Sequence, residues 1–460
     1  MDRPVDVVVV GGGISGLATA YFLIRKRPDL RVVLCEKDSD VGGTMQTSHC
    51  EGFVVEHGPN GFLTNKPHTL DLCRELGVEG YLLPSSRETR HRFIYTGGRL
   101  REIPLNPLKF MLGSAILSPF GKLRLLGEVL VPPRRDGADE SLSQFALRRL
   151  GREALERLLD PMVAGVYAAN PDQVSLKSTF PTIYELEQRY GGLIKGMLAL
   201  QREKGKGEKR VGGPAGPGGE LTSFKEGVSF LPKALARVLG DRVLTGCTVT
   251  GVGRSKDSFL VRTEEGIIET RRVVIASPAY AAAEMVKGLD GDLHRELSQI
   301  PYAPMGVVAL GYSKEEVGKP SGFGLLVPRG EGLSILGVLW DSSIFHNRAP
   351  EDRVLIRVMV GGARQPHLAL QPPQSLLATA LEGVRITMGL DAKPLFSRVF
   401  SFPRAIPQYV VGHSQRLKRI EEILKGVPGL FLGGNAYRGV GLNDCVKSSR
   451  EVADRVVDSL

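Results

Sequence analysis

The sequence of 460 residues has little cysteine and no long apolar segment, and each lack excludes a class of protein. Its five cysteines form no CxxC pair and no cluster with histidine, so we expect neither a disulfide framework nor a zinc or other metal site. No run of 18 or more apolar residues occurs, so we expect no membrane-spanning helix. The apolar run at residues 7–10 is too short for a cleavable signal peptide. These absences favour a protein of the reducing cytoplasm.

Positive charge is in excess, with a formal net charge of +10, and much of it lies in one segment. Residues 87–135 contain ten Lys/Arg against three Asp/Glu, a local net charge of +7. Such a segment attracts nucleic acid, anionic lipid or an acidic small molecule, or it is simply a solvated basic face. No recognised nucleic-acid-binding motif accompanies it, so we expect no nucleic-acid partner.

The order of sequence patterns predicts an α/β protein, and the length predicts about three domains. Residues 5–10 form a largely β-branched apolar run typical of a strand buried on both faces, and helical periodicity follows it. Helical patterns dominate residues 140–200, short strands recur over 243–276, and a strand-rich region spans 305–400. Residues 202–220 are rich in glycine and lysine and predict a flexible surface loop.

A glycine motif near the N-terminus predicts a dinucleotide site. Gly11, Gly13 and Gly16 match GxGxxG directly between the predicted strand and the predicted helix. The first glycine permits a tight turn, the second allows the backbone to approach a pyrophosphate, and the third allows the helix to pack on the strand. The N-terminus of the helix offers unpaired N–H groups to the phosphates. Glu36 ends the second predicted strand, where a carboxylate accepts hydrogen bonds from ribose hydroxyls.

Two further glycine segments identify the dinucleotide as FAD. Gly42 and Gly43, taken with the first motif, resemble the two-part signature of the amine-oxidase and phytoene-desaturase superfamily of flavoproteins, although Thr44 replaces the arginine usual after that pair. Segments 432–435 and 439–442 resemble the flavin-end turn of the same superfamily. The resemblance implies FAD as cofactor. The expected cofactor-binding residues are Gly11, Gly12, Gly13, Ile14, Ser15, Gly16, Glu36, Lys37, Gly42, Gly43, Thr44, Gly58, Pro59, Asn60, Gly61, Val249, Gly434, Asn435, Val440, Gly441 and Leu442.

Other motifs, in their order and spacing, resemble the oxygen-dependent protoporphyrinogen oxidases of this superfamily. These motifs occupy residues 52–60, 92–95, 165–168, 322–328, 359–362, 405–409 and 439–445. The resemblance implies oxidation of protoporphyrinogen IX to protoporphyrin IX in haem biosynthesis, with six electrons removed in three steps and molecular oxygen reduced to hydrogen peroxide. It implies a tetrapyrrole and oxygen as partners, and it leaves a homodimer open.

The resemblance also implies an architecture that is α/β in its cofactor domain and α+β overall. We expect a discontinuous, doubly wound FAD-binding domain at residues 1–86, 201–276 and 404–460. We expect a helical membrane-binding lobe at 87–200 and a mixed-sheet substrate-binding domain at 277–403. Apolar side chains between residues 110 and 120, flanked by basic residues, either lie in a bilayer interface or belong to a core helix with basic edges. Peripheral attachment to the cytoplasmic membrane therefore stays open.

By the same resemblance, Arg92 pairs with a propionate of the substrate, because a guanidinium binds a carboxylate through two hydrogen bonds. The apolar walls around the tetrapyrrole are expected from Phe323, Leu326, Leu339 and Met359, although residues of these types are more often simply core. Gly165 and Tyr167 are expected to line the opposite side. We interpret His57 and His413 as structural, and we identify no certain catalytic residue because the hydride passes to the flavin.

Three other functions stay open. A coproporphyrinogen III oxidase of the same fold would act on a tetrapyrrole with four propionates, and the basic segment 87–135 agrees with such a substrate. A carotenoid desaturase or amine oxidase is the second, although we can place neither the flavin-facing lysine nor the aromatic cage that amine oxidases often carry. A binding-only protein related to Rab escort proteins is the third, and two intact FAD motifs disfavour it.

Overall fold

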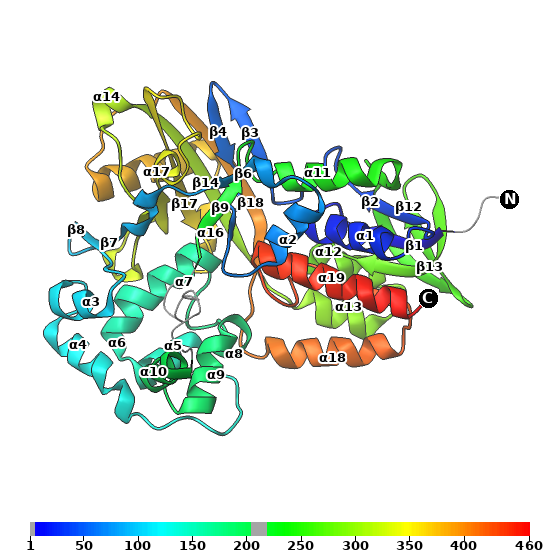
Figure 1. The fold of residues 1–460 in the computed structure, drawn as a ribbon, viewed down its shortest axis with the longest axis horizontal. Helices are drawn as coiled ribbons and strands as arrows, with labels where there is room; N and C mark the ends of the chain where they lie inside the picture. The colour runs from blue at the N-terminus through cyan, green and yellow to red at the C-terminus, as the bar shows by residue number, and fades with distance from the viewer. Residues whose placement is uncertain (1–4, 204–218) are drawn as a thin grey trace.

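The computed structural model describes residues 5–203 and 219–460. The described chain contains two large sheets, a small two-stranded sheet, a small three-stranded sheet and a helical lobe (Figure 1). In that view the first sheet lies on the right with the N- and C-terminal helices, the second lies at the upper left, and the lobe lies at the lower left. The loop predicted at 202–220 falls almost entirely outside the described residues.

The first sheet has the strand order β10-β2-β1-β13-β12-β11, with β19 pairing β13. Its strands are β1 (Val5–Val10), β2 (Val32–Glu36), β10 (Val243–Thr245), β11 (Val249–Ser255), β12 (Ser258–Thr263), β13 (Ile267–Ile275) and β19 (Leu430–Leu432). Strand β1 lies parallel between β2 and β13. Val7 and Val9 pack into the core on one face while Val8 and Val10 pack into the core on the other. The apolar run at 5–10 is therefore a strand buried on both faces, as predicted.

Helices cover both faces of this sheet, which gives the predicted doubly wound fold. One face carries α1 (Ile14–Lys26), α11 (Phe230–Leu239) and α19 (Leu442–Asp458). The other face carries α12 (Ala279–Val286), α13 (Gly291–Ser298) and α18 (His413–Lys425). The boundary expected after residue 276 is therefore too early, because α12 and α13 bury their apolar sides against the first sheet. Segments from both ends and the middle of the chain meet in this one unit.

The second sheet has the order β18-β14-β17-β16-β15-β7-β8. Its strands are β7 (Arg92–Thr96), β8 (Arg99–Glu102), β14 (Tyr302–Ser313), β15 (Gly324–Leu326), β16 (Gly337–Leu339), β17 (Arg353–Gly361) and β18 (Phe396–Pro407). All neighbours are antiparallel except β15 and β7, which are parallel. Helix α17 (Pro373–Met388) packs on one face, through a core shared with β14 and β17.

Two expected boundaries of the second unit are corrected by this sheet. Strands β7 and β8 lie inside the range expected for the helical lobe, yet they extend the second sheet by pairing with β15. Strand β18 belongs to the same sheet and runs past the boundary expected at residue 404. The pairing of Arg92 with Gly324 joins residues far apart in sequence, and no local pattern indicates such a partner.

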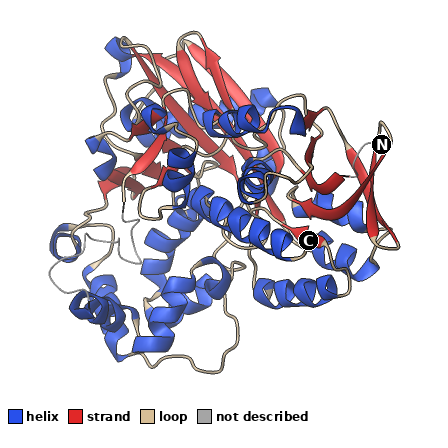
Figure 2. Cartoon of the chain, turned by 45° about the vertical axis from the view of Figure 1, so that its right-hand side comes forward, coloured by secondary structure: helices blue, strands red, loops and turns tan. Residues whose placement is uncertain are grey.

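Helices make up the remaining lobe, which is blue without red arrows at the bottom of Figure 2. They are α3 (Pro107–Gly113), α4 (Pro119–Leu126), the short turn η3 (Gly127–Leu130), α5 (Leu142–Arg149), α6 (Arg152–Ala154), the π-helical turn η4 (Leu155–Leu159), α7 (Asp160–Tyr167), α8 (Leu176–Thr179), α9 (Pro181–Tyr190) and α10 (Leu193–Glu203). Smaller elements elsewhere are β3 (Thr47–Cys50), β4 (Phe53–Glu56), β5 (Phe62–Leu63), β6 (Leu82–Pro84), β9 (Leu221–Phe224), α2 (His68–Glu75), α14 (Lys314–Val317), α15 (Asp341–Ile344) and α16 (Pro366–Ala369).

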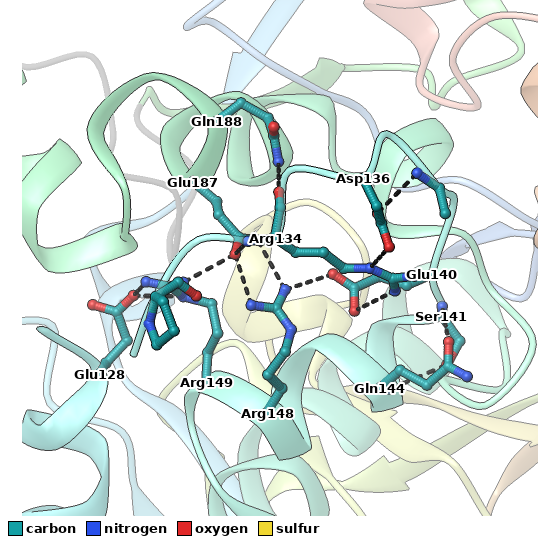
Figure 3. A network of polar contacts seen from close by, with 12 residues as sticks. Glu128, Arg134, Asp136, Glu140, Ser141, Gln144, Arg148, Arg149, Glu187 and Gln188 are labelled. Atoms are coloured by element: carbon teal, nitrogen blue, oxygen red, sulfur yellow. Dashed lines mark hydrogen bonds and ion pairs between the residues drawn. The ribbon is translucent and has the colours of Figure 1, made fainter. Parts of the chain in front are cut away.

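A buried ionic network holds the lobe together (Figure 3). Arg149 is fully buried, and its guanidinium donates to the carboxylates of Glu128 and Glu187. Glu128 also accepts from the backbone N–H groups of Leu193 and Ile194, at 2.8 and 3.1 Å. Glu187 accepts a further hydrogen bond from Arg148. Each buried charge therefore has an opposite charge and additional hydrogen bonds, the condition under which burial is tolerated.

Candidate cofactor and substrate site

The N-terminal glycine turn has the geometry that a pyrophosphate site needs. Gly11 has φ +109°, and a Cβ there would lie 3.1 Å from the backbone of Ala276. A Cβ on Gly16 would lie within 1.9 Å of the Gly11 carbonyl oxygen, so only glycine allows α1 to pack this close. A Cβ on Gly13 would meet no atom within 4 Å, and Gly13 occupies the N-cap position of α1, where it provides no side-chain cap. The first turn of α1 contains no acidic side chain. Its N–H groups are therefore available to an anion at an open position.

Glu36 lies beside this turn at the end of β2. Its carboxylate is buried and accepts hydrogen bonds from the N–H groups of Gly12, at 2.5 Å, and Asp38, at 2.9 Å. A Cβ on Gly12 would lie 2.8 Å from the Cβ of Glu36, so this glycine is needed for the carboxylate to approach. Lys37 points away, because it is exposed and pairs with Asp38. Val249 is a core residue that packs in the same cluster as Cys35, the neighbour of Glu36.

The second glycine pair lies directly against the first. Gly42 donates its N–H to the Gly12 carbonyl at 2.9 Å and forms an isolated bridge with Gly13. A Cβ on Gly43 would lie 3.5 Å from the Gly13 Cα. Exposed Thr44 follows, and its carbonyl oxygen lies 2.9 Å from where a Cβ on Gly58 would be. The turn at 11–16, the pair at 42–43 and the loop at 58–61 are thus brought together, and their binding of the cofactor stays a prediction.

The C-terminal glycine segment joins the same unit. Gly434 has φ +112° and follows β19, while Gly441 begins α19 without a side-chain cap. Helix α19 lies beside α1, and Ser449 donates to the Ser15 carbonyl at 2.9 Å. The Asn435 carbonyl accepts from the Tyr409 hydroxyl at 2.6 Å, which fixes the turn between them. Val440 and Leu442 flank the uncapped start of α19 and are half-buried. The starts of α1 and α19 therefore both lack side-chain caps and can accept an anionic or electron-rich group.

Two buried polar atoms in this region have no partner within the described residues. The side-chain nitrogen of Asn60 and the hydroxyl of Ser277 are both buried and unpaired. Buried polar atoms are normally hydrogen-bonded, so such orphans indicate a missing partner. With the open position at Gly13, they fit a bound FAD, whose oxygens and nitrogens accept and donate hydrogen bonds. Asn443 differs, because its amide accepts from Thr69 and donates to Leu63 and is therefore satisfied by the protein.

Four of the expected substrate residues share one face of the second sheet, namely Arg92, Leu326, Leu339 and Met359. In the register of the strands, Arg92 pairs with Gly324, Gly324 with Leu339, and Leu339 with Arg357. Residues paired across neighbouring strands point to the same face, so Arg92 and Leu339 lie on one surface. The next row on this face runs from Leu326 through Gly337 to Met359. Valines between these rows point to the opposite face and pack under α17.

Arg92 has an unusual environment for an arginine. Burial lowers its pKa, and no carboxylate within the described residues pairs with it. Its Nε donates to the Thr89 carbonyl at 3.4 Å, and its guanidinium carbon lies 5.3 Å from the ring centroid of Phe323. A buried guanidinium without a counter-charge is costly. The arrangement therefore leaves most of its donors for an anion from outside the protein.

The remaining substrate residues have packing roles in the structure. A Cβ on Gly165 would lie 2.2 Å from the side chain of Leu326, so this glycine brings α7 directly against the substrate face. Tyr167 packs edge-on against Phe180 in the core of the lobe.

His57, which we interpreted as structural, stacks on Phe400, with ring centroids 3.9 Å apart. His413 stacks on Tyr409, with 4.2 Å between the ring centroids, and burial lowers its pKa to about 4.

A polar cluster that the sequence did not reveal joins the loop at 56–60 to the second sheet. Arg357 is fully buried on β17 and pairs with Asp341 at the start of α15. Arg348 is buried nearby and pairs with Glu56 at 3.0 Å. Burial raises the pKa of Glu56, and the adjacent Arg348 opposes that change. The sequence contains one signal of this cluster, which is the charged Arg357 inside the apolar run at 354–360. A charge in such a run indicates a buried ion pair.

The family can be named from comparison with known proteins. The family described as flavin containing amine oxidoreductase matches residues 14–457, and the chain belongs to it. The protein is therefore an FAD-dependent oxidoreductase, as the glycine motifs indicated. The resemblance to protoporphyrinogen oxidases is also confirmed. The chain is 34% identical over 480 residues to the chloroplastic protoporphyrinogen oxidase of Oryza sativa subsp. japonica, covering 99% of this chain and 88% of the relative.

Two other relatives add to this comparison. Coproporphyrinogen III oxidase of Bacillus subtilis (strain 168) is 29% identical over 464 residues, covering 98% of this chain and 97% of that protein. The crystal structure of a candidate protoporphyrinogen oxidase from Exiguobacterium sp. 255-15 superposes with a TM-score of 0.85 at 26% identity, covering 99% of both chains. The fold class predicted from the sequence is thereby confirmed.

Proposed function

We propose that the protein oxidises protoporphyrinogen IX to protoporphyrin IX in haem biosynthesis, with molecular oxygen as acceptor. Three two-electron steps remove six electrons and six protons from the substrate, and three molecules of oxygen become three of hydrogen peroxide. The observation that carries this proposal is the half-buried Arg92, which has no carboxylate partner within the described residues and lies at one end of an apolar sheet face. A carboxylate at Arg92 and a large apolar ring over Leu339 match the two chemical parts of a porphyrinogen. The related protoporphyrinogen oxidases support the same substrate.

FAD, when bound, supplies hydride acceptance, and the chain's own residues supply position. In this proposal Arg92 holds one propionate through two charge-assisted hydrogen bonds. Leu326, Leu339 and Met359 lie under the tetrapyrrole and keep water away from its bridge carbons. The pyrophosphate is held by the glycine turn at 11–16, the glycine pair at 42–43 and the uncapped start of α1. Glu36 accepts a hydrogen bond from the adenosine ribose. Because the cofactor performs the chemistry, orientation is the main contribution of the protein.

The experiment is steady-state turnover of the purified, FAD-loaded protein, followed by porphyrin fluorescence. We expect protoporphyrin to form only in the presence of oxygen and FAD. A protein that is fully loaded with flavin but leaves protoporphyrinogen unchanged would contradict the proposal. Initial rates should be corrected for spontaneous oxidation by a parallel sample of flavin-free protein.

Coproporphyrinogen III is the second candidate substrate. It has four propionates, and further basic side chains lie on the same β7–β8 hairpin as Arg92, namely exposed Arg99 and half-buried Arg101. The Bacillus subtilis relative, whose name is coproporphyrinogen III oxidase, matches over nearly its full length. The ratio of kcat/KM for the two porphyrinogens decides between them. A ratio favouring coproporphyrinogen by tenfold or more would replace protoporphyrinogen as the proposed substrate.

We also propose that the lobe rests on an anionic membrane surface. No helix in the described part of the chain is long and apolar enough to span a bilayer. However, large apolar side chains are exposed on α3, α4 and η3 and just before α3, namely Leu105, Leu108, Leu112, Phe120, Leu123, Leu126 and Leu130. Within residues 110–120, Ile116 and Leu117 are core residues, whereas Leu112 and Phe120 are exposed and therefore available to a bilayer interface. Exposed apolar residues next to exposed Lys109 match an interfacial surface.

Vesicle co-sedimentation tests this membrane surface. We expect binding to vesicles with anionic lipid, weaker binding to zwitterionic vesicles, and loss of binding for the double variant Leu112→Ser with Phe120→Ser. Both side chains are exposed, so the double variant should keep the fold and the bound flavin. Equal sedimentation of the variant and the unchanged protein would exclude this surface.

A further inference from the structure

Arg357 uses all of its hydrogen-bonding capacity in one buried place. Its Nε and one Nη2 hydrogen go to the two oxygens of Asp341, at 2.5 and 3.0 Å. Its Nη1 donates to the carbonyls of Glu56, at 2.7 Å, and Gly58, at 3.2 Å. The remaining Nη2 hydrogen goes to the side-chain oxygen of Asn60. A guanidinium has five N–H donors, and here each of the five has an acceptor.

This guanidinium acts through geometry, because its charge is already balanced. Asp341 lies against Arg357 as a buried counter-ion. The second buried arginine of the region, Arg348, is balanced in the same way by Glu56. Two neutral ion pairs therefore lie between the second sheet and the loop at 56–60. Arg357 contributes a rigid, planar set of donors that fixes the carbonyls of Glu56 and Gly58 and the side-chain amide of Asn60.

The contact also fixes which way the Asn60 amide points. Arginine has donors only, so the amide oxygen of Asn60 must face Arg357 and its NH2 group must face away. That nitrogen is buried and has no partner within the described residues. The protein thus holds a donor in place without supplying an acceptor. Asn443 shows the contrast, since both ends of its amide are used by protein groups.

The sheet register places this donor relative to the carboxylate site. Arg92, Gly324, Leu339 and Arg357 form one row across four adjacent strands. Three strand spacings of about 4.8 Å separate the two arginines by about 14 Å. Arg92 therefore lies at one end of the apolar face. Asn60, in contact with Arg357 and next to the cofactor glycines, lies toward the other end.

We propose that Arg357 is a positioning residue that holds the Asn60 carboxamide so that its NH2 group donates to an acceptor atom of the bound FAD. The placement of the substrate in this proposal rests on the proposed function, but the contact with the cofactor does not. Loss of the donor should disturb the flavin before any substrate is added. Loss of Arg357 should produce the same disturbance, because the amide would then be free to turn.

The variant Asn60→Asp separates this role from a merely structural one. Aspartate keeps an oxygen for Arg357, so the contact and the fold are retained, but the NH2 donor is replaced by a second oxygen. We expect a melting temperature equal to or above that of the unchanged protein. We also expect a shifted visible absorption spectrum of the bound flavin, a more negative midpoint potential, and a fall in kcat of about tenfold or more.

Arg357→Lys, Asn60→Ala and their combination measure the coupling, and Arg348→Lys is the matched control. We expect the first two variants to shift the flavin potential in the same direction, and the double variant to be no worse than Asn60→Ala alone. Arg348 is equally buried but does not contact Asn60, so Arg348→Lys should lower the melting temperature without moving the flavin spectrum.

Three results would overturn the inference. One is an Asn60→Asp protein with an unchanged flavin spectrum, potential and kcat. Another is an increase in KM with no change in the flavin, which would assign the donor to the substrate. The third is a double variant whose loss of kcat equals the product of the losses in Arg357→Lys and Asn60→Ala, because the two residues would then act independently. A wild-type protein that binds FAD but oxidises no porphyrinogen would refute the proposed function alone, because the flavin measurements would still test Arg357.

Discussion

Replacing Arg92 by alanine should weaken substrate binding without weakening the fold. The structure gives the reason, since the guanidinium is half-buried, has a pKa lowered by burial and has no carboxylate partner within the described residues. A charge-assisted hydrogen bond is worth about 1.5–3 kcal/mol, so KM should rise about 10- to 150-fold. The effect on kcat should be smaller, because the carboxylate is bound equally in the ground state and the transition state.

The stability of Arg92→Ala provides a second, independent test of the role of this residue. Removing a half-buried charge that no carboxylate balances relieves part of a desolvation cost. The loss of the contact with the Phe323 ring opposes this by about 0.5–1 kcal/mol. We therefore expect the melting temperature not to fall. If Arg92 stabilised the fold through its charge, the melting temperature of Arg92→Ala would fall.

The assay is a comparison of Arg92→Ala with Arg92→Lys and Arg99→Ala. Lysine keeps the charge but not the two-pronged geometry and should give an intermediate KM. Arg99 is exposed on the same hairpin, so its loss should change KM by less than threefold. An unchanged KM for Arg92→Ala, or a lowered melting temperature with normal kinetics, would refute the assignment of a propionate to this residue.

Three further predictions follow from the described geometry. Gly13→Val should leave a folded protein without flavin, because nothing in the protein lies within 4 Å of its Cβ position while a bound pyrophosphate would; flavin absorbance after gel filtration measures it. Glu128→Gln should lower the free energy of unfolding by about 3 kcal/mol, and Glu156→Gln, in an exposed pair, by less than about 1 kcal/mol, as urea denaturation would show. Burial lowers the pKa of His413 to about 4, so the unfolded chain takes up the proton first, and stability should be lost as pH falls from about 6.5 to about 4, by up to about 3 kcal/mol. His413→Gln should remove that part of the pH dependence, and an unchanged slope would contradict it.

The cofactor half of the molecule could be predicted because its signals are local. A buried strand, a glycine turn and a helix follow one another in residues 5–26, and each observed element agrees with its pattern. Glu36 could be placed by counting, since it ends the next strand. The family and FAD followed from these short segments and were confirmed by comparison.

The substrate half could be predicted only by resemblance, because its contacts are distant in sequence. Strand β7 finds its partner in β15, more than 200 residues later, and the segment was therefore expected to be part of the helical lobe. The partners of Arg357 come from residues 56–60 and from Asp341, and no spacing rule connects them. Likewise, Gly165 was expected to line the side of the substrate site opposite the apolar wall, whereas it packs directly against Leu326 of that wall.

The most direct test of the central claim is the ratio of hydrogen peroxide to porphyrin produced by the purified, FAD-loaded protein. Oxidation of protoporphyrinogen IX in three two-electron steps predicts three molecules of peroxide for each protoporphyrin, with matching oxygen consumption. A flavin-loaded protein that forms no porphyrin above the spontaneous rate, or that forms porphyrin without consuming oxygen, would contradict the account.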